Sequence, residues 1–173
     1  MTNPASFKAL SLALLSTCFS GAALAHGDAA HDKPPHATPA EQQVFGIAGR
    51  AAEVSRSIDI TMSDDMRFKP DRIDVREGET VRLRLHNKGQ VLHELVIGTP
   101  ADLDQHAALM AKFPDMAHEE AHMAHVPAGK SGSIIWKFNR AGSFDFACLI
   151  NGHYQAGMRG RITVQAKAAS GSN

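Results

Sequence analysis

Short runs in which apolar and polar residues alternate follow residue 43 and predict β-strands. They are VFGIAGR, VSRSIDITM, RIDVREG, TVRLRLHNKG and LHELVIG, and after residue 130 SGSIIWKF, GSFDFAC and GRITVQA. An apolar residue at every second position buries one face of a strand and leaves the other face in water. Many short strands with turns between them are typical of two antiparallel sheets packed face to face. We therefore expect an all-β domain, an antiparallel β-sandwich, over residues 44–166.

A segment with helical signals interrupts the strands and forms an insertion over about residues 99–127. Thr99 can cap a helix, Pro100 suits its first position, and Asp102 suits its first turn. We expect this helix to end near Lys112, and the domain to be an all-β fold with one short helical insertion.

The first 25 residues predict export. Lys8 precedes the apolar run ALSLALLSTCFSGAALA, which ends in Ala-Leu-Ala at residues 23–25, a small-residue cleavage pattern. The run is too short, and too interrupted by Ser, Thr and Gly, for a membrane span of about 20 residues. We expect residues 1–25 to be a cleaved signal peptide and residues 26–173 to be a periplasmic protein without membrane insertion.

Composition adds two expectations about the rest of the chain. Residues 26–43 contain few large apolar side chains and should form a disordered, His-rich tail, and residues 167–173 should be a second disordered tail. The chain has 18 Lys and Arg residues against 18 Asp and Glu residues. This balance gives no electrostatic reason to expect nucleic acid as a partner. We expect a monomer.

Removal of the leader, which carries Cys18, leaves Cys148 without a second cysteine in the chain. In an oxidising compartment an unpaired cysteine is buried and inert, held by a metal, or reactive. Composition alone favours burial, because free Cys packs as a small hydrophobic residue. The neighbours of Cys148 favour a metal site.

Cys148, His153 and Met158 recur at even intervals in FACLINGHYQAGMRG, and Gly152 and Gly157 permit bends that turn all three toward one point. A thiolate, an imidazole and a thioether suit a soft, redox-active ion. Zinc accepts Cys and His, but Met is a poor zinc ligand. The spacing therefore predicts a copper site that needs one more ligand.

A blue-copper site takes a second histidine, with Met as a long axial ligand. His93 in QVLHELVIG lies at the edge of a predicted strand just after a turn, which fits this role. His86 is the alternative, but its place after the alternating VRLRL favours a position on the strand surface. We therefore expect His93 to complete the site.

Two segments resemble the copper-binding halves of cupredoxins such as plastocyanin. FDFACLINGHYQAGMRGRITV resembles the loop that carries Cys, His and Met into the last strand, and RFKPDRIDVREGETVRLRLHNKGQVLHELVIG resembles the first half. The likeness covers about residues 44–164 and extends to bacterial periplasmic copper-tolerance cupredoxins with a Met/His-rich insert. It implies a Greek-key β-sandwich with one type 1 copper held by His93, Cys148, His153 and Met158.

Residues next to the ligands distinguish the chain from other cupredoxins. Plastocyanins and azurins commonly have an Asn after the first His ligand, which ties the ligand loops together, whereas this sequence has Glu94. We therefore expect different hydrogen bonds around the metal. Ala147 and Leu149 flank Cys148, so the adjacent His that leads to a second copper centre in multicopper oxidases and nitrite reductases is missing.

The remaining histidines and methionines indicate further copper sites. We expect FPDMAHEEAHMAHVPAGK, after the helix, to be a loop or a short helix, and a helix would place His118, His122 and His125 on one face. Imidazoles and thioethers bind cuprous or cupric ions, although a polar, solvated segment that binds nothing is the alternative. The candidate donors are His26, His31, His36, Met110, Met116, His118, His122, Met123 and His125.

These observations predict a periplasmic type 1 copper protein that binds copper and transfers single electrons, serving copper tolerance or homeostasis. The alternative is a dedicated electron shuttle between redox enzymes with no role in copper handling. The partner would be a redox protein or a copper-trafficking protein. We expect a carrier rather than an enzyme, with oxidation of cuprous ion left open. An inert structural sandwich would require the four donors to coincide by chance.

Overall fold

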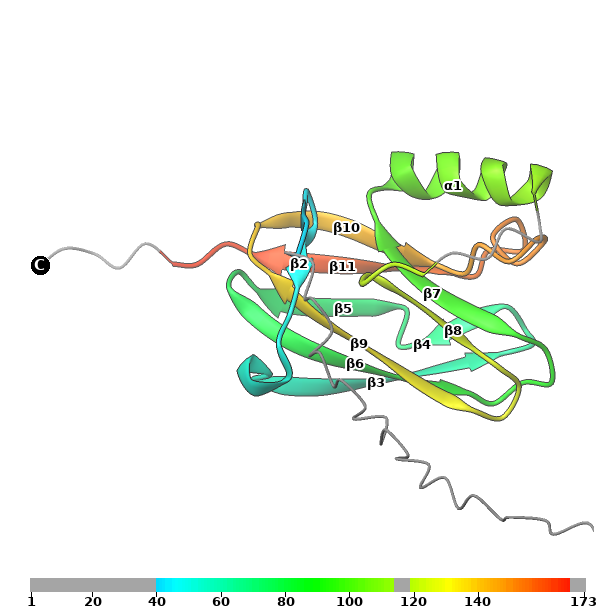
Figure 1. The fold of residues 1–173 in the computed structure, drawn as a ribbon, viewed down its shortest axis with the longest axis horizontal. Coiled ribbons are helices and arrows are strands. Elements are labelled where there is room, and N and C mark those ends of the chain that lie inside the picture. Colours follow the sequence, from blue (N-terminus) through cyan, green and yellow to red (C-terminus); the bar gives the residue numbers. More distant parts are fainter. Residues whose placement is uncertain (1–39, 114–118, 169–173) are drawn as a thin grey trace, which may run out of the picture. The chain divides into compact units, whose positions relative to one another are not determined.

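The alternating runs form two packed β-sheets in a computed structural model, which describes residues 40–113 and 119–168 (Figure 1). One sheet has six strands in the order β1 (Gln42–Gln43), β2 (Gly46–Ala48), β9 (Ser131–Phe138), β6 (Glu79–Asn87), β3 (Arg56–Ser63) and β4 (Arg67–Lys69). The other has five strands in the order β5 (Arg72–Arg76), β11 (Arg159–Gln165), β10 (Gly142–Ala147), β7 (His93–Gly98) and β8 (Met123–Val126). A short 3-10 helix covers Ala51–Glu53, and helix α1 covers Pro100–Lys112. The prediction of a β-sandwich with a helical insertion is confirmed.

The inward-facing positions of the strands form the hydrophobic core between the sheets. Trp136, Phe138 and Phe146 are buried at its centre. The Nε1–H of Trp136 donates to the backbone carbonyl of Phe45 at 3.0 Å, so this buried donor is satisfied. Each large apolar side chain buried in this way contributes about 1.5–3 kcal/mol of transfer free energy. The packed sheets therefore give the loops at their ends a rigid support.

Two strand pairings are parallel, which the prediction of an antiparallel sandwich did not include. β3 pairs with β6, and β5 pairs with β11, in parallel registers. After β3 the chain forms β4 in the same sheet, crosses to β5 in the other sheet, and returns as β6 beside β3 in the same direction. Parallel neighbours require a crossover of this kind.

The predicted boundaries differ slightly from the structure at the N-terminal side. Gln42 and Gln43, at the end of the expected disordered tail, pair with β2 as strand β1. The predicted signal peptide (1–25), the rest of that tail, and residues 169–173 of the C-terminal tail lie outside the described residues. Five candidate copper donors also lie outside them: His26, His31, His36, Met116 and His118.

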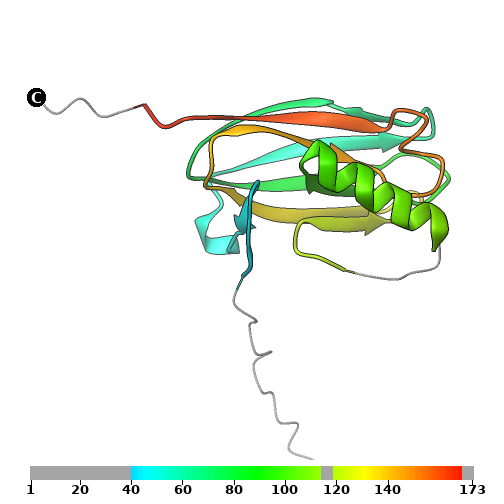
Figure 2. The same ribbon diagram turned by 90° about the horizontal axis from the view of Figure 1, so that it is seen from above.

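Helix α1 begins and ends where the sequence predicts. The Thr99 side chain accepts from the backbone N–H of Asp102, and the Asp102 carboxylate accepts from the backbone N–H of Thr99, which is a capping box. The buried face of the helix carries Leu103, Ala107 and Met110, and it lies over β7 and β10 (Figure 2). No helix in the described ranges is long and apolar enough to cross a membrane.

The Met/His-rich segment after α1 ends in a strand, so the expectation of a loop or short helix is wrong at Met123–Val126. This strand, β8, pairs antiparallel with β7, with Val96 opposite Met123 and Glu94 opposite His125. The edge of β7 presents backbone donors and acceptors that β8 satisfies, and this tertiary pairing outweighs local helix propensity. His122 and His125 therefore do not share a helical face.

Candidate metal centre

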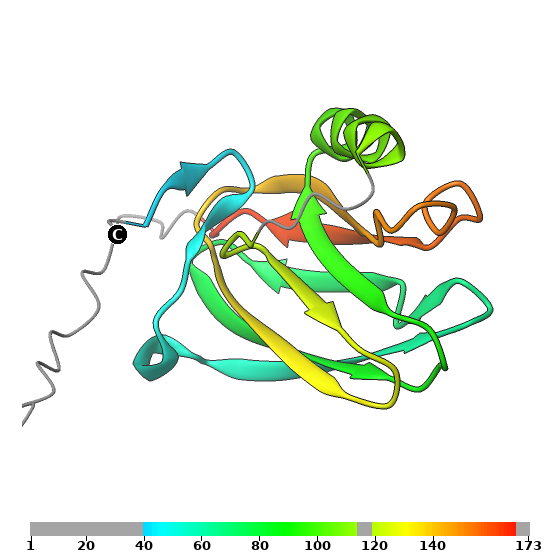
Figure 3. The ribbon, with the colours of Figure 1, turned by 45° about the vertical axis from the view of Figure 1, so that its right-hand side comes forward.

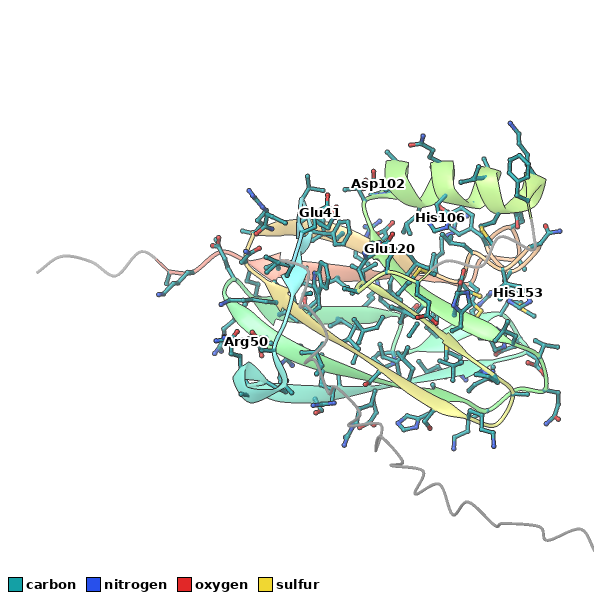
Figure 4. The ribbon with its side chains drawn as sticks, viewed as in Figure 1. Glu41, Arg50, Asp102, His106, Glu120 and His153 are labelled. Atoms are coloured by element: carbon teal, nitrogen blue, oxygen red, sulfur yellow. The ribbon has the colours of Figure 1, made fainter. Side chains whose placement is uncertain are left out.

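Three predicted donors meet at one end of the five-stranded sheet. His93 is the first residue of β7, and Cys148 directly follows β10. Because β7 and β10 are antiparallel neighbours, with Val96 opposite Ala147, the start of one strand lies beside the end of the other. The loop between β10 and β11 brings His153 to the same end (Figures 3 and 4).

Ligand atoms of His93, Cys148 and His153 all lie within 4.8 Å of one another. Cys148 Sγ is 3.3 Å from His153 Nδ1, and the two imidazole centroids are 5.0 Å apart. Within the described residues this is the one such group of potential metal donors. His86, the alternative to His93, lies in β6, where its ring contacts Asp59 and Ser131.

The loop that carries Met158 is closed by its own backbone hydrogen bonds. Gly152 and Gly157 have φ values of 87° and 90°, which L side chains rarely adopt, so these glycines make the predicted bends. The Met158 N–H donates to the His153 carbonyl at 3.1 Å, and the Cys148 N–H donates to the Met158 carbonyl at 3.0 Å. Met158 is fully buried in the same core cluster as Cys148. Its assignment as the axial ligand stays a prediction.

The orientation of His93 is set by a carboxylate that the sequence analysis did not identify. His93 Nε2 is 3.1 Å from Oδ1 of Asp64, in the turn after β3. The backbone N–H of Gln90 donates to the other carboxylate oxygen, and it is the main cause that lowers the pKa of Asp64. His93 Nδ1 is buried and has no hydrogen-bond partner in the described chain. An orphaned buried nitrogen costs about 1–3 kcal/mol, so Nδ1 marks the position where a metal ion would bind.

Buried Asn87 holds the loop that leads to His93. Its side-chain amide donates to the carbonyls of Val91 and Val126, each at 2.8 Å, and its Oδ1 accepts from the Gly89 N–H. A Cβ on Gly89 would lie 1.8 Å from Asp64 Oδ1, so only glycine allows this close approach of the loop. The loop and the Asp64 turn are thus fixed against each other before any metal binds.

Burial controls the protonation of the donors. Burial raises the pKa of the Cys148 thiol to about 12, so at neutral pH the metal-free protein holds the protonated form. Burial, and then the nearby His93, lower the pKa of His153, which favours the neutral imidazole that binds metals. The thiol must therefore lose a proton when a metal binds, whereas His153 is ready to bind. One thiolate, two imidazoles and a thioether fit copper.

Glu94, the residue after His93, connects the strands around the site. Its side chain is 2% exposed, and one carboxylate oxygen accepts from the Leu149 N–H at 2.7 Å. The other oxygen is 2.8 Å from Nε2 of half-buried His125 in β8. The Glu94 N–H also donates to Cys148 Sγ at 3.4 Å. One residue thus links the strand of His93, the segment of Cys148 and the Met/His-rich insert.

The other candidate copper donors in the described chain serve packing as well. Met110 and Met123 are buried between α1 and the five-stranded sheet, where their thioethers contribute apolar surface. His125 contacts Glu94 rather than a second group of donors. The His122 ring packs edge-on against Phe45. Copper binding by these four residues stays a prediction.

Comparison with known proteins identifies the family. Residues 37–164 match the sequence profile of the cupredoxin-like domain family. The chain belongs to this family. It is 46% identical over 158 residues to the copper-resistant cuproprotein CopI of Rubrivivax gelatinosus, a match that covers 88% of this chain and 95% of that protein. It is 39% identical over 158 residues to CopI of Pseudomonas aeruginosa, covering 75% of this chain and 87% of that protein.

Solved structures agree on the fold of this cupredoxin. The structure of dithionite-reduced auracyanin from Roseiflexus castenholzii superposes with a TM-score of 0.56 at 20% sequence identity, and the match covers 64% of this chain and 98% of auracyanin. At this identity the likeness supports the sandwich fold alone. In this cupredoxin Glu94, which stands where plastocyanins and azurins commonly have an Asn, links the segments of His93 and Cys148 through the Leu149 N–H.

We predict that the metal affinity of this cupredoxin rises with pH. Because binding displaces the Cys148 proton, whose pKa is about 12, the apparent affinity should increase about tenfold per pH unit between about pH 7 and pH 9. Anaerobic competition for Cu(I) against a chromophoric chelator, corrected for the chelator's own protonation, measures this slope. An affinity independent of pH in this range would contradict the protonated thiol.

We predict that replacement of Glu94 disturbs both stability and the metal site. Glu94→Ala leaves the buried Leu149 N–H without an acceptor, which should cost about 1–3 kcal/mol in the free energy of unfolding of the metal-free protein. It should also shift the visible spectrum of the Cu(II) form, since it removes a support of Cys148. Glu94→Gln keeps an acceptor for the Leu149 N–H. Its loss of stability and its shift of the visible spectrum should therefore both be smaller than those of Glu94→Ala.

Asp59→Ala is the matched control, because Asp59 is an exposed carboxylate that also contacts a histidine. Urea unfolding and visible spectroscopy on the three variants measure the two effects. If Glu94→Ala and Asp59→Ala change the free energy of unfolding and the visible spectrum by the same amounts, Glu94 has no special role at the site.

Proposed function

We propose that this cupredoxin is exported to the periplasm, binds one copper ion through His93, Cys148, His153 and Met158, and transfers single electrons in the service of copper tolerance. One observation carries the proposal. A fully buried, unpaired thiol lies beside two imidazoles, and His93 Nδ1 is buried without a partner. In a purely structural sandwich this arrangement would only lower stability, because the orphaned nitrogen destabilises the metal-free fold.

The donors divide into a buried and an accessible part. His93, Cys148 and Met158 are fully buried, which excludes water and external thiols from the sulfur ligands. His153 is half-exposed, and its neighbours Gly152 and Gln155 are exposed. Bound copper supplies one-electron redox chemistry, cycling between the cuprous and cupric states. The edge of His153 is therefore the place where a redox protein or a copper-trafficking protein would dock.

The role in copper tolerance is supported by the names of the related proteins, which are copper-resistant cuproproteins. The leader pattern in residues 1–25 supports a periplasmic location. Histidines 26, 31 and 36 of the tail would add weaker copper sites in the same compartment. A dedicated electron shuttle would use the same copper centre but would leave tolerance unaffected when the centre is lost.

Cys148→Ala tests the proposal. The Cu(II)-loaded wild type should show intense visible absorption from the copper–thiolate bond, and the variant should lose it. A strain that lacks the gene should regain copper tolerance with the wild type and fail to regain it with the variant. His86→Gln should keep both properties, because His86 lies outside the donor group.

The outcomes separate the alternatives. A wild type without the absorption when loaded with Cu(II) would contradict the copper site itself. Loss of the absorption with full rescue of tolerance by Cys148→Ala would contradict the role in tolerance and favour the electron shuttle. Periplasmic fractionation of the complemented strain tests the location.

A further inference from the structure

We propose that Tyr154, held by Asp104 of helix α1, is a positioning residue that clamps the loop of His153 and slows the departure of copper. This loop, residues 150–157, lies between Cys148 and Met158 and is called the His153 loop below. The inference rests on the copper site proposed above and concerns how that site retains its ion. It gives the helical insertion a role at the copper end of the sandwich.

Tyr154 is the buried anchor of the His153 loop. Within residues 150–157 its side chain is the one that is buried, with 8% of its surface exposed, whereas the next residues, Gln155 and Ala156, are exposed. A buried aromatic ring contributes a large apolar surface to the core. The ring packs between α1 and the five-stranded sheet in a cluster with Val96, Leu103, Ala107, Met123, Ala147 and Leu149. The loop is therefore attached to the insertion through this side chain.

The hydroxyl of Tyr154 adds a polar bond to the helix. Its O–H donates to Oδ1 of Asp104 at 2.5 Å. Figure 1 shows the loop after β10, in orange, beneath α1. Asp104 directly follows Leu103, whose side chain is buried in the same cluster as the tyrosine ring. A hydrogen bond to a carboxylate is stronger than one between neutral groups, so α1 holds the loop by a charge-assisted bond as well as by packing.

Arg159 and Gly157 fix Tyr154 from the side of the last strand. The guanidinium of Arg159 lies 4.0 Å from the centroid of the tyrosine ring, which is a cation–π contact. Arg159 Nη2 also donates to the Tyr154 carbonyl at 3.3 Å, and the Gly157 N–H donates to the same carbonyl at 3.0 Å. The ring, the hydroxyl and the backbone of Tyr154 are thus each held by a different contact.

The clamp acts on His153 because His153 directly precedes Tyr154. His93 lies in β7 and Cys148 directly follows β10, and both side chains are fully buried. His153 is half-exposed and lies on a loop, so it can turn outward without the unpairing of a strand. Loops of this kind open locally more often than paired strands do. An outward turn of His153 must displace Tyr154, and the bond to Asp104 opposes it.

The rate of copper release tests the clamp. Tyr154→Phe removes the hydroxyl and keeps the ring, and Asp104→Ala removes the acceptor. Each should release Cu(I) to an excess of a chromophoric chelator about tenfold faster than the wild type, the order expected for loss of one hydrogen bond to a charged group. Asp104→Asn keeps an acceptor oxygen and should restore most of the wild-type rate. The double variant should release copper no faster than either single variant, because both remove the same bond.

Hydrogen exchange of the metal-free protein tests the clamp without copper. The N–H groups of Gly157 and Met158 donate to carbonyls within the His153 loop, so their exchange reports its opening. Both should exchange about tenfold faster in Tyr154→Phe than in the wild type. Asp59→Ala is the matched control, because Asp59 is an exposed carboxylate that contacts the ring of His86 on the other sheet. It should keep the wild-type rates of exchange and of copper release.

The proposal is overturned if Tyr154→Phe releases copper at the wild-type rate, or if its loop amides exchange at the wild-type rate. Equal acceleration by Asp59→Ala also overturns it, since the effect would then be a general loss of stability. Failure of the copper site itself would show as a Cu(II)-loaded wild type without thiolate absorption. The exchange rates of the metal-free protein then still decide the clamp, so the two failures are distinguishable.

Discussion

The pairing of β7 with β10 sets Val96 opposite Ala147, and it thereby brings His93 beside Cys148 although the two residues are far apart in sequence. Each donor lies just beyond or at the end of a strand whose interior is locked by core packing. The loop to β11 then needs only two glycine bends to bring His153 and Met158 back. The positions of the donors thus follow from a sheet register, and a slip of that register would separate them.

The same arrangement places two metal donors in the interior, and the cost of one of them favours metal binding. The Cys148 thiol, with a pKa of about 12, stays neutral and packs as a small apolar group, whereas the imidazole nitrogen without a partner destabilises the metal-free core. The surrounding contacts hold both donors in position but give His93 Nδ1 no hydrogen-bond partner. Asp64 fixes the ring of His93, and Glu94 fixes the segment of Cys148. An ion that binds thiolate and imidazole together satisfies both groups at once, which is how metal binding becomes coupled to stability.

The Met/His-rich insert is part of the fold rather than an appendage. β8 completes the five-stranded sheet, and its His125 reaches the buried Glu94. Helix α1 covers the outer face of β7 and β10, close to the copper end. Through the contact of His125 with Glu94, the insert touches the residue that supports the segment of Cys148.

Local patterns were sufficient to predict every strand except β1, β4 and β8, together with helix α1 and the group of His93, Cys148 and His153. Period-two alternation, a capping box and ligand spacing are all properties of short segments, so they can be read without the fold. The position of β8, the two parallel pairings and the contacts of Asp64 and Glu94 with the ligand segments depend on strands far apart in sequence. Glu94 was visible as a departure from the expected Asn, but its partners Leu149 and His125 were not, because only the sheet order brings them together.

The most direct test of the account is a crystal structure of the protein loaded with one equivalent of copper, with anomalous diffraction recorded at the copper edge. We predict a single strong peak bonded to Nδ1 of His93, Sγ of Cys148 and Nδ1 of His153, with the Met158 sulfur as a longer fourth ligand. A peak at any other position, or an ion bound without the Cys148 sulfur, would contradict the account.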